Sequence, residues 1–188
     1  EIEKINNKVV LYGIKHGKKL GSTLSLLFIY KDHYIIKHIG DSRIYLIKDK
    51  IYLLTEDHSW VAEQLSKGTM SLKEAETHKN RNALTRCIGI DGRISIYEKI
   101  DSFAKDESFL LCSDGLYKPL GEDFIYSFIN QSKNEKEWDL QDIAIGLLEQ
   151  VKKAGAVDNV SLIQVMPQYE KRGNNILNSL RKFIKKGV

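Results

Sequence analysis

Two carboxylates stand where buried strands are expected to end. Asp114 follows the apolar run Phe109–Cys112 and precedes Gly115, and Asp158 opens the last apolar run as Asp158-Asn159-Val160. Carboxylates at the ends of core strands can converge on a hard divalent cation such as Mg²⁺ or Mn²⁺. The alternative is structural, because Asp-Gly and Asp-Asn are common turn sequences.

A third carboxylate, Asp41, lies in Gly40-Asp41-Ser42-Arg43 between two apolar runs, where the residue types favour a hairpin turn. Other chemistries have less support. The five histidines show neither HxH nor HExxH spacing, and no GxSxG, Walker or GxGxxG motif occurs. Cys112 falls inside an apolar run and is expected to be an unreactive core residue.

The composition is that of one globular domain and excludes several classes of protein. The 188 residues carry a net charge of +4, with 42% hydrophobic and 29% charged residues. No apolar run approaches the roughly 20 residues that span a bilayer. Two cysteines cannot form a disulfide framework, and no secretory signal is visible, so a reducing, cytoplasmic location is expected. The charge is too small to predict nucleic-acid binding.

The first half of the chain predicts a helix and then closely spaced strands. Apolar residues fall on one helical face over Glu1–His16, which also suggests that the sequence begins inside a longer protein. The next runs lack helical period and are separated by short turns, which predicts antiparallel pairing. The first of them is apolar on both faces, as in a strand between two layers. The predicted strands are Ser22–Lys31, His33–Ile39, Arg43–Lys48 and Lys50–Thr55.

The second half mixes helices and strands. Short helices are predicted over Ser59–Ser66 and Ser71–Lys79, the second with a capping box from Ser71 to Glu74. A longer helix follows from the apolar spacing of Leu140–Val151. The order of elements indicates an α+β antiparallel architecture. The later strands are predicted over Ile94–Ile100, Glu107–Ser113 and Asn159–Val165.

Six short motifs in a fixed order carry a family resemblance. The sequence resembles the bacterial PPM-type, metal-dependent protein serine/threonine phosphatases. The motifs are Gly21-Ser22-Thr23, His38-Ile39-Gly40-Asp41-Ser42-Arg43-Ile44-Tyr45, Leu54-Thr55-Glu56-Asp57-His58-Ser59, Asn82-Ala83-Leu84-Thr85-Arg86-Cys87-Ile88-Gly89, Leu111-Cys112-Ser113-Asp114-Gly115-Leu116 and Asp158-Asn159-Val160-Ser161.

The resemblance implies a sandwich of two antiparallel sheets flanked by helices (α/β/β/α) over residues 1–167. It implies a site for two Mn²⁺ or Mg²⁺ ions, with Asp114 and Asp158 as ligands, and a third, weaker ion held by Asp41 with Asp114. Residues 57–90 match the flap beside the active site. The implied activity is hydrolysis of phosphoserine and phosphothreonine on proteins by a metal-activated water. The implied partners are phosphorylated proteins and a cognate serine/threonine kinase.

Two departures from the family pattern qualify this expectation. The family's first strands carry a phosphate-binding arginine, an acidic pair and a metal-bridging Asp-Gly, all upstream of the helix that Glu1–His16 matches. We therefore expect the domain to be incomplete at its N-terminus and the chain as it stands not to be a competent phosphatase. The alternative is a catalytically inactive pseudophosphatase that acts as a protein-binding regulatory module.

The second departure is Lys118, which stands where bacterial members carry an aspartate that binds the third metal. We expect its ammonium to lie near Asp41 and Asp114, to replace the charge of that metal and to lower the pKa of both carboxylates. The alternative is a solvated lysine on a turn before Pro119.

The basic tail, residues 168–188, lies outside the resemblance. Its apolar residues share one face at helical spacing and are flanked by lysine and arginine. Contact with an anionic membrane, binding of a partner and docking on its own domain all fit this pattern. Nucleic-acid binding is not expected, because Phe183 is the only aromatic residue among the basic residues 171–188, and base stacking requires aromatic side chains interleaved with them. The apolar residues are Ile176, Leu177, Leu180, Phe183 and Ile184.

Overall fold

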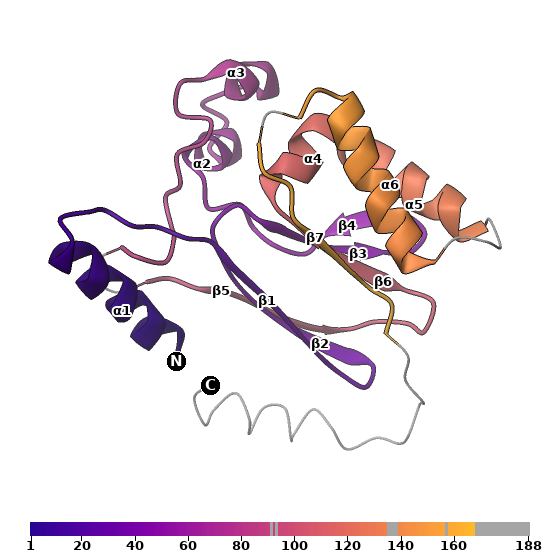
Figure 1. Ribbon diagram of the computed structural model, residues 1–188, viewed down its shortest axis with the longest axis horizontal. Helices are drawn as coiled ribbons and strands as arrows, with labels where there is room; N and C mark the ends of the chain where they lie inside the picture. Colours follow the sequence, from indigo (N-terminus) through magenta and orange to yellow (C-terminus); the bar gives the residue numbers. More distant parts are fainter. Residues whose placement is uncertain (91, 93, 135–138, 157, 168–188) are drawn as a thin grey trace.

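Two antiparallel sheets form the centre of the computed structural model, which describes residues 1–90, 92, 94–134, 139–156 and 158–167. The predicted tail lies outside these residues. The three-stranded sheet has the order β1-β2-β5 and the four-stranded sheet the order β4-β3-β6-β7 (Figure 1). The strands are β1 (Leu24–Tyr30), β2 (His33–Ile39), β3 (Arg43–Ile47), β4 (Ile51–Leu53), β5 (Tyr97–Ser102), β6 (Ser108–Cys112) and β7 (Leu162–Val165).

Helices lie at the outer face of the four-stranded sheet and at the edge of the sandwich. In Figure 1 the helices α4, α5 and α6 cover the four-stranded sheet, whereas α2 and α3 project from the sandwich. Among the described helices, none is long and apolar enough to cross a membrane. The helices are α1 (Ile2–Lys15), α2 (Trp60–Ser66), α3 (Leu72–Thr77), α4 (Asp114–Leu120), α5 (Glu122–Asn134) and α6 (Leu140–Lys153).

Strand β3 contributes to both hydrophobic cores. Ile44 and Leu46 pack between the two sheets, whereas Tyr45 and Ile47 pack under the helices. This division follows from the alternation of side chains along a strand. Between the sheets, the Phe109 ring makes an edge-to-face contact with Tyr34 at 5.3 Å between ring centroids. The middle layer is therefore buried on both faces, as the sandwich architecture predicts.

The segment Gly40–Ser42 joins the two sheets and is not the predicted hairpin turn. Ile39 pairs with Leu24 in one sheet, and Arg43 pairs with Cys112 in the other. Gly40 has φ +119°, and a Cβ atom there would lie 2.4 Å from Thr23 Cγ2, so glycine is required at this crossover. Asp41 is consequently placed at the rim where the sheets separate. Two of the short turns predicted between the first strands are confirmed as hairpins, because Tyr30 pairs with His33 and Ile47 pairs with Ile51.

Strand β1 is an edge strand, and the prediction that it is buried on both faces is wrong. Three alternate side chains are exposed: Leu26 by 44%, Phe28 by 49% and Tyr30 by 45%. They point away from the core between the sheets because β1 contributes only its other face to that core. The apolar residues on the outer face of β1 therefore do not indicate that this face is buried in the structure.

Local signals located most of the helices. Ser59 caps α2, and Ser71 forms the predicted capping box with Glu74. The helices α4 and α5 were not predicted, although α5 carries Glu122 in its first turn and an apolar pair repeated four residues apart in Phe124-Ile125 and Phe128-Ile129. Strand β5 begins at Tyr97, three residues later than predicted.

The Arg43 guanidinium joins four elements beside the crossover. It donates to Asp57 Oδ1 and Oδ2 at the start of the flap, residues 57–90, with Nη2 2.7 Å from Oδ2. Its Nη1 donates to Glu122 Oε1 of α5 at 2.9 Å. The guanidinium carbon lies 3.8 Å from the centroid of the Tyr117 ring of α4. One side chain thus fixes β3, the flap, α4 and α5 relative to each other.

Replacing Arg43 by methionine is expected to lower the free energy of unfolding by about 3 kcal/mol, because the change leaves the Asp57 carboxylate largely buried without a cation. Arg43→Lys is expected to recover only part of this loss, since lysine lacks the bidentate fork. Urea denaturation measures both. The control is Lys4→Met, because its pair with Glu1 is exposed to water and contributes little to stability. Equal losses in Arg43→Met and Lys4→Met would contradict the assigned role.

Candidate metal centre

Asp114 and Asp158 lie at the same end of the paired strands β6 and β7 of the four-stranded sheet. Asp114 is the first residue of α4, directly after β6, and Asp158 precedes the paired strand β7. Ser113 joins the two segments: its N–H donates to Ser161 O at 3.0 Å, and its Oγ accepts from Ser161 N at 3.0 Å. This pairing holds the backbone beside both aspartates in a fixed arrangement.

Gly115 permits the close approach of the two segments. A Cβ atom at this position would lie 2.3 Å from the backbone oxygen of Asn159, which excludes any larger residue without a shift of the backbone. The carboxylate of Asp158 is exposed, and its Oδ1 accepts from Asn159 N at 2.7 Å. The Asp-Gly and Asp-Asn sequences therefore serve the local turn geometry, and this structural role is compatible with ligand binding.

Asp41 reaches the same region from the crossover between the sheets. The Tyr117 hydroxyl of α4 donates to Asp41 O at 3.0 Å and fixes its backbone. Burial raises the pKa of the Asp41 carboxyl, and the charge of Asp114 raises it further, whereas the charge of Lys118 lowers it. Lys118 thus lowers the pKa of Asp41, as predicted, but burial and the charge of Asp114 outweigh it, so that the net shift of this pKa is upward.

Lys118 lies one helical turn after Asp114 on α4. Its Nζ donates to Asp114 Oδ2 at 2.7 Å and to Asn82 Oδ1 in the flap at 3.2 Å. The lysine side chain is 41% exposed, so its ammonium is in contact with water as well as with these two partners. The structure places a cation beside Asp114, and its role as a substitute for a metal ion stays a prediction.

The chemistry of these donors suits Mg²⁺ or Mn²⁺, which prefer carboxylate oxygens. Within the described residues, however, no three histidine, cysteine, aspartate or glutamate side chains come together in a way that could hold a metal ion. Asp114, Asp158 and Asp41 therefore fit such a site by type and by location but do not complete it. A bound ion requires donors beyond this set.

Two buried histidines were missed by a search for metal-ligand spacing. His38 and His58 are 1% and 2% exposed, and their rings stack at 5.2 Å between centroids. Gly40 N donates to His58 Nδ1 at 3.1 Å, so the ring hydrogen of neutral His58 lies on Nε2. That atom is buried and has no hydrogen-bond partner among the residues that the structure describes, and the same holds for Thr85 Oγ1. What marks these two histidines is that both rings contact Gly40, the neighbour of Asp41, and this arrangement can be seen only in the folded chain.

His58 fastens the base of the flap to the crossover. Its backbone N–H donates to Gly40 O at 2.8 Å, and its backbone oxygen accepts from Thr85 N at 2.9 Å. On the other side, His38 Nε2 lies 3.0 Å from Gly40 O, and its Nδ1 lies 2.8 Å from Ser25 Oγ. The crossover that positions Asp41 is thus enclosed by two neutral imidazoles.

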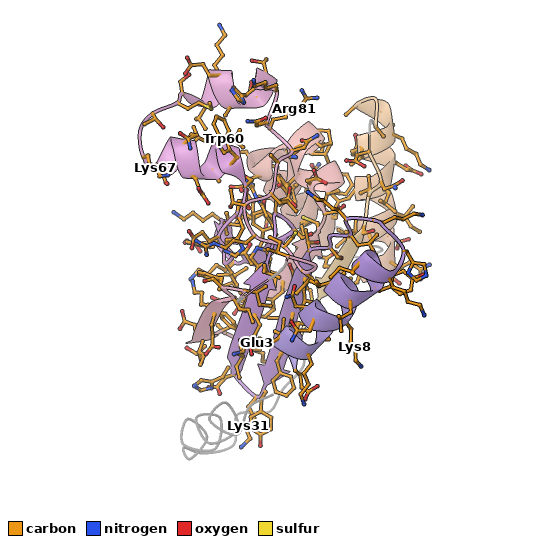
Figure 2. All side chains as sticks on the ribbon, turned by 90° about the vertical axis from the view of Figure 1, so that its left-hand side faces the viewer. Glu3, Lys8, Lys31, Trp60, Lys67 and Arg81 are labelled. Atoms are coloured by element: carbon orange, nitrogen blue, oxygen red, sulfur yellow. The ribbon has the colours of Figure 1, made fainter. Side chains whose placement is uncertain are left out.

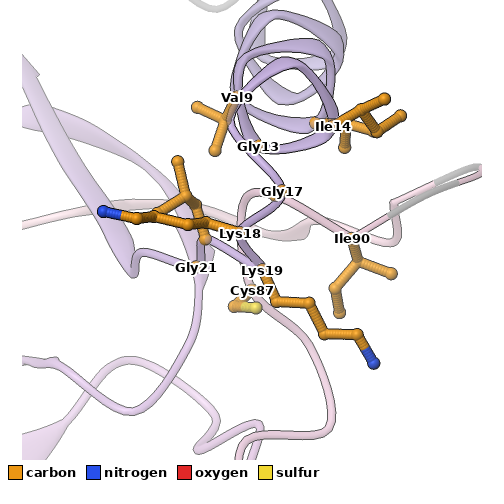
Figure 3. Close-up of a pocket in the computed structure, with 12 residues that line it drawn as sticks. Val9, Gly13, Ile14, Gly17, Lys18, Lys19, Gly21, Cys87 and Ile90 are labelled. Carbon is orange, nitrogen blue, oxygen red and sulfur yellow. The ribbon is translucent and has the colours of Figure 1, made fainter.

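A mainly apolar pocket beside α1 lies away from the three aspartates. It has a volume of about 700 Å³ and is bordered by the end of α1, residues 17–21 and the end of the flap (Figure 3). Its lining is mainly apolar, and the amino groups of Lys18 and Lys19 point to opposite sides. Asn6 of α1 holds this region to the flap through bonds to Gly89 N and Ile90 O. The pocket contains no carboxylate and therefore does not belong to the candidate metal centre.

Acidification is expected to destabilise the fold through His58. Burial first, and then the charges of His38 and Arg86, lower its pKa from 6.5 to about 4, while Asp57 and Glu63 oppose the shift. The unfolded chain therefore binds a proton that the folded chain excludes as the pH falls from about 6.5 to about 4. This difference removes about 3 kcal/mol of stability.

The measurement is the free energy of unfolding by urea between pH 7 and pH 4.5. His58→Gln is expected to flatten this pH dependence, because glutamine does not titrate. The exposed His16→Gln is the control and should leave the slope unchanged. A slope that is the same in wild type and His58→Gln would contradict the assignment.

Comparisons with known proteins agree with this geometry. Residues 5–151 match the protein phosphatase 2C family. The chain is 29% identical over 178 residues to the serine/threonine phosphatase stp of Listeria welshimeri, covering 93% of this chain and 69% of that protein. The Streptococcus agalactiae serine/threonine phosphatase superposes with a TM-score of 0.80 at 28% identity, covering 87% of this chain and 66% of that one.

A more distant structure shares the fold. The catalytic domain of the serine/threonine protein phosphatase PstP, solved with two manganese ions, has a TM-score of 0.72 at 22% identity, covering 85% of this chain and 65% of that one. The chain thus spans about two thirds of the length of these relatives. Because the family match extends over most of the sequence and the sandwich is shared, the chain belongs to the protein phosphatase 2C family.

Proposed function

We propose that this chain is part of a protein phosphatase that hydrolyses phosphoserine and phosphothreonine on proteins. The observation that carries the proposal is the placement of Asp114 and Asp158 at one sheet edge, with their backbones joined through Ser113. Asp41 approaches from the crossover and lies near enough for the charge of Asp114 to raise the pKa of its carboxyl, after the larger effect of burial. The relatives named above are serine/threonine phosphatases, which supports the same chemistry here.

Asp114 and Asp158 would hold Mn²⁺ or Mg²⁺ in the intact protein, with Asp41 contributing to a further, weaker site. Such ions, when bound, polarise the phosphoryl oxygens and lower the pKa of a bound water. The contribution of this chain is to fix the ligands: the Ser113 contacts and Gly115 position the pair, and Tyr117 positions the backbone of Asp41. The presence of two manganese ions in the PstP structure supports manganese as one of the metals.

The remaining ligands of this site are proposed to come from additional strands that pack beside β1 and β7. Both strands lie at sheet edges, and Phe28 of β1 and Ile163 of β7 are 49% and 61% exposed. A pocket of about 310 Å³ opens between the two strands next to the candidate centre. It is lined by five hydroxyl-bearing residues together with Arg43, Leu111, Cys112, Leu162 and Ile163; the hydroxyls are those of Thr23, Ser25, Ser42, Ser113 and Ser161.

The partners of such an enzyme are phosphorylated proteins and the kinase that modifies them, and its place is the cytoplasm. The proposed partners follow from the activity, because a phosphatase of this kind opposes a serine/threonine kinase, whereas the proposed location follows from the cysteine usage, which indicates a reducing compartment. Detection of phosphoproteins that accumulate when the gene is deleted tests the substrate class directly.

Asp114→Asn and Asp158→Asn in the intact protein are each expected to lower the Mn²⁺-dependent hydrolysis of a phosphothreonine peptide more than about 100-fold, because each removes a charged metal ligand. Their unfolding midpoints should stay close to that of the wild type. The exposed Asp106→Asn is the matched control and should keep its activity. Full activity in either ligand variant would overturn the assignment, and a wild type that hydrolyses no phosphopeptide at millimolar Mn²⁺ would favour the pseudophosphatase.

Lys118 is proposed to occupy the position of the third metal ion. Activation of the intact wild type by Mn²⁺ should then follow a single phase, because an ammonium repels a further cation near Asp114. Lys118→Asp is expected to introduce a second, weaker phase of activation, which a titration of activity against Mn²⁺ from micromolar to tens of millimolar concentration resolves. Two phases already present in the wild type would show that Lys118 does not replace the ion.

A further inference from the structure

The flap is a self-packed unit that is anchored to the sandwich at both ends. At its start Asp57 binds Arg43, and at its end Ile88 pairs with Ser22. Between these anchors α2, α3 and the following loop project from the sandwich; Figure 2 shows Trp60, Lys67 and Arg81 at this end of the molecule. The rings of Trp60 and His78 stack at 4.5 Å between centroids. The outer part of the flap is therefore held together by its own contacts and joined to the sandwich at its two ends.

The loop after α3 also meets α4 through one lysine. Lys118 Nζ lies 2.7 Å from Asp114 Oδ2 and 3.2 Å from Asn82 Oδ1. An ammonium has three donors, so it can serve both acceptors at once. The carboxylate fixes the ammonium, and the ammonium in turn fixes the amide of Asn82. The bond to Asn82 therefore runs from the candidate metal centre to the projecting loop.

We propose that Lys118 and Asn82 are positioning residues, which hold the flap loop of residues 78–85 against Asp114 and so set the access of phosphorylated protein segments to the metal centre. The tie between the flap loop and α4 consists of the hydrogen bonds from Lys118 Nζ to Asp114 Oδ2 and to Asn82 Oδ1. Its consequence for substrate access rests on the proposed phosphatase function.

Lysine suits this role for a physical reason. A methionine of similar length cannot donate a hydrogen bond, and an aspartate would repel Asp114. An arginine keeps the charge and the donors, so it can restore the bridge. Because the hydrogen bond to Asn82 involves a charged donor at a partly exposed position, its loss is expected to change the opening equilibrium of the loop by about 5-fold.

Hydrogen exchange on the chain of residues 1–188 tests the tie without any need for activity. In Lys118→Met and in Asn82→Ala, the amides of Ala83 and Thr85, which are hydrogen-bonded in the folded chain, are expected to exchange about 5-fold faster. The double variant should exchange no faster than either single one, because both changes break the same contact. Lys118→Arg should restore the wild-type rate, and the exposed Lys67→Met is the control.

Unchanged exchange in both single variants would overturn the tie, and so would additive effects in the double variant. In the intact protein, Asn82→Ala is further expected to change the KM for a phosphothreonine peptide several-fold relative to the KM for p-nitrophenyl phosphate, which lacks the peptide segments on either side of the phosphorylated residue. An equal effect on both substrates would overturn the role in substrate access. A wild type that hydrolyses neither substrate would overturn the proposed function, whereas the exchange experiment would still decide the tie.

Discussion

The Arg43 guanidinium is the contact on which the arrangement of the candidate centre depends. Arg43 lies at the start of β3, whose side chains alternate between the two hydrophobic cores, so its backbone is fixed from both faces. From there it neutralises Asp57 of the flap and stacks on the Tyr117 ring. Tyr117 in turn holds the backbone of Asp41. The Arg43 side chain, which is 20% exposed, thus fixes the flap, and through Tyr117 the backbone of Asp41, relative to the four-stranded sheet.

The acidic residues themselves contribute little to the contacts that position them. The Ser113 hydroxyl and backbone join the two segments that carry Asp114 and Asp158, and Gly40 lets the crossover pass Thr23. The polar atoms around the crossover are buried and mostly paired, as buried hydrogen-bonding groups must be. The Asp114 and Asp158 carboxylates accept hydrogen bonds of their own, from Lys118 Nζ and from Asn159 N, and the fixed backbone determines where both carboxylates lie.

Features that depend on local chemistry were predictable, and those that depend on distant partners were not. The helix caps at Ser59 and Ser71 follow from side chains within three residues. The crossover at Gly40–Ser42 has the same residue types as a hairpin turn, and only the distant partners Leu24 and Cys112 decide between them. The candidate ligands Asp114, Asp158 and Asp41 came from the motif order, whereas the enclosure by His38 and His58 required the fold.

The charges around Lys118 explain why a lysine can be accommodated beside a candidate metal ligand. Asp41 and Asp114 carry two negative charges when ionised, and Lys118 supplies one positive charge in direct contact with Asp114 only. The pKa of Asp41 is raised by burial first, and then by the charge of Asp114, which Lys118 only partly offsets. The lysine therefore compensates part of the negative charge of the pair. Its remaining hydrogen-bonding capacity is directed to Asn82 of the flap, a contact of a side chain with a distant loop that motif order alone does not reveal.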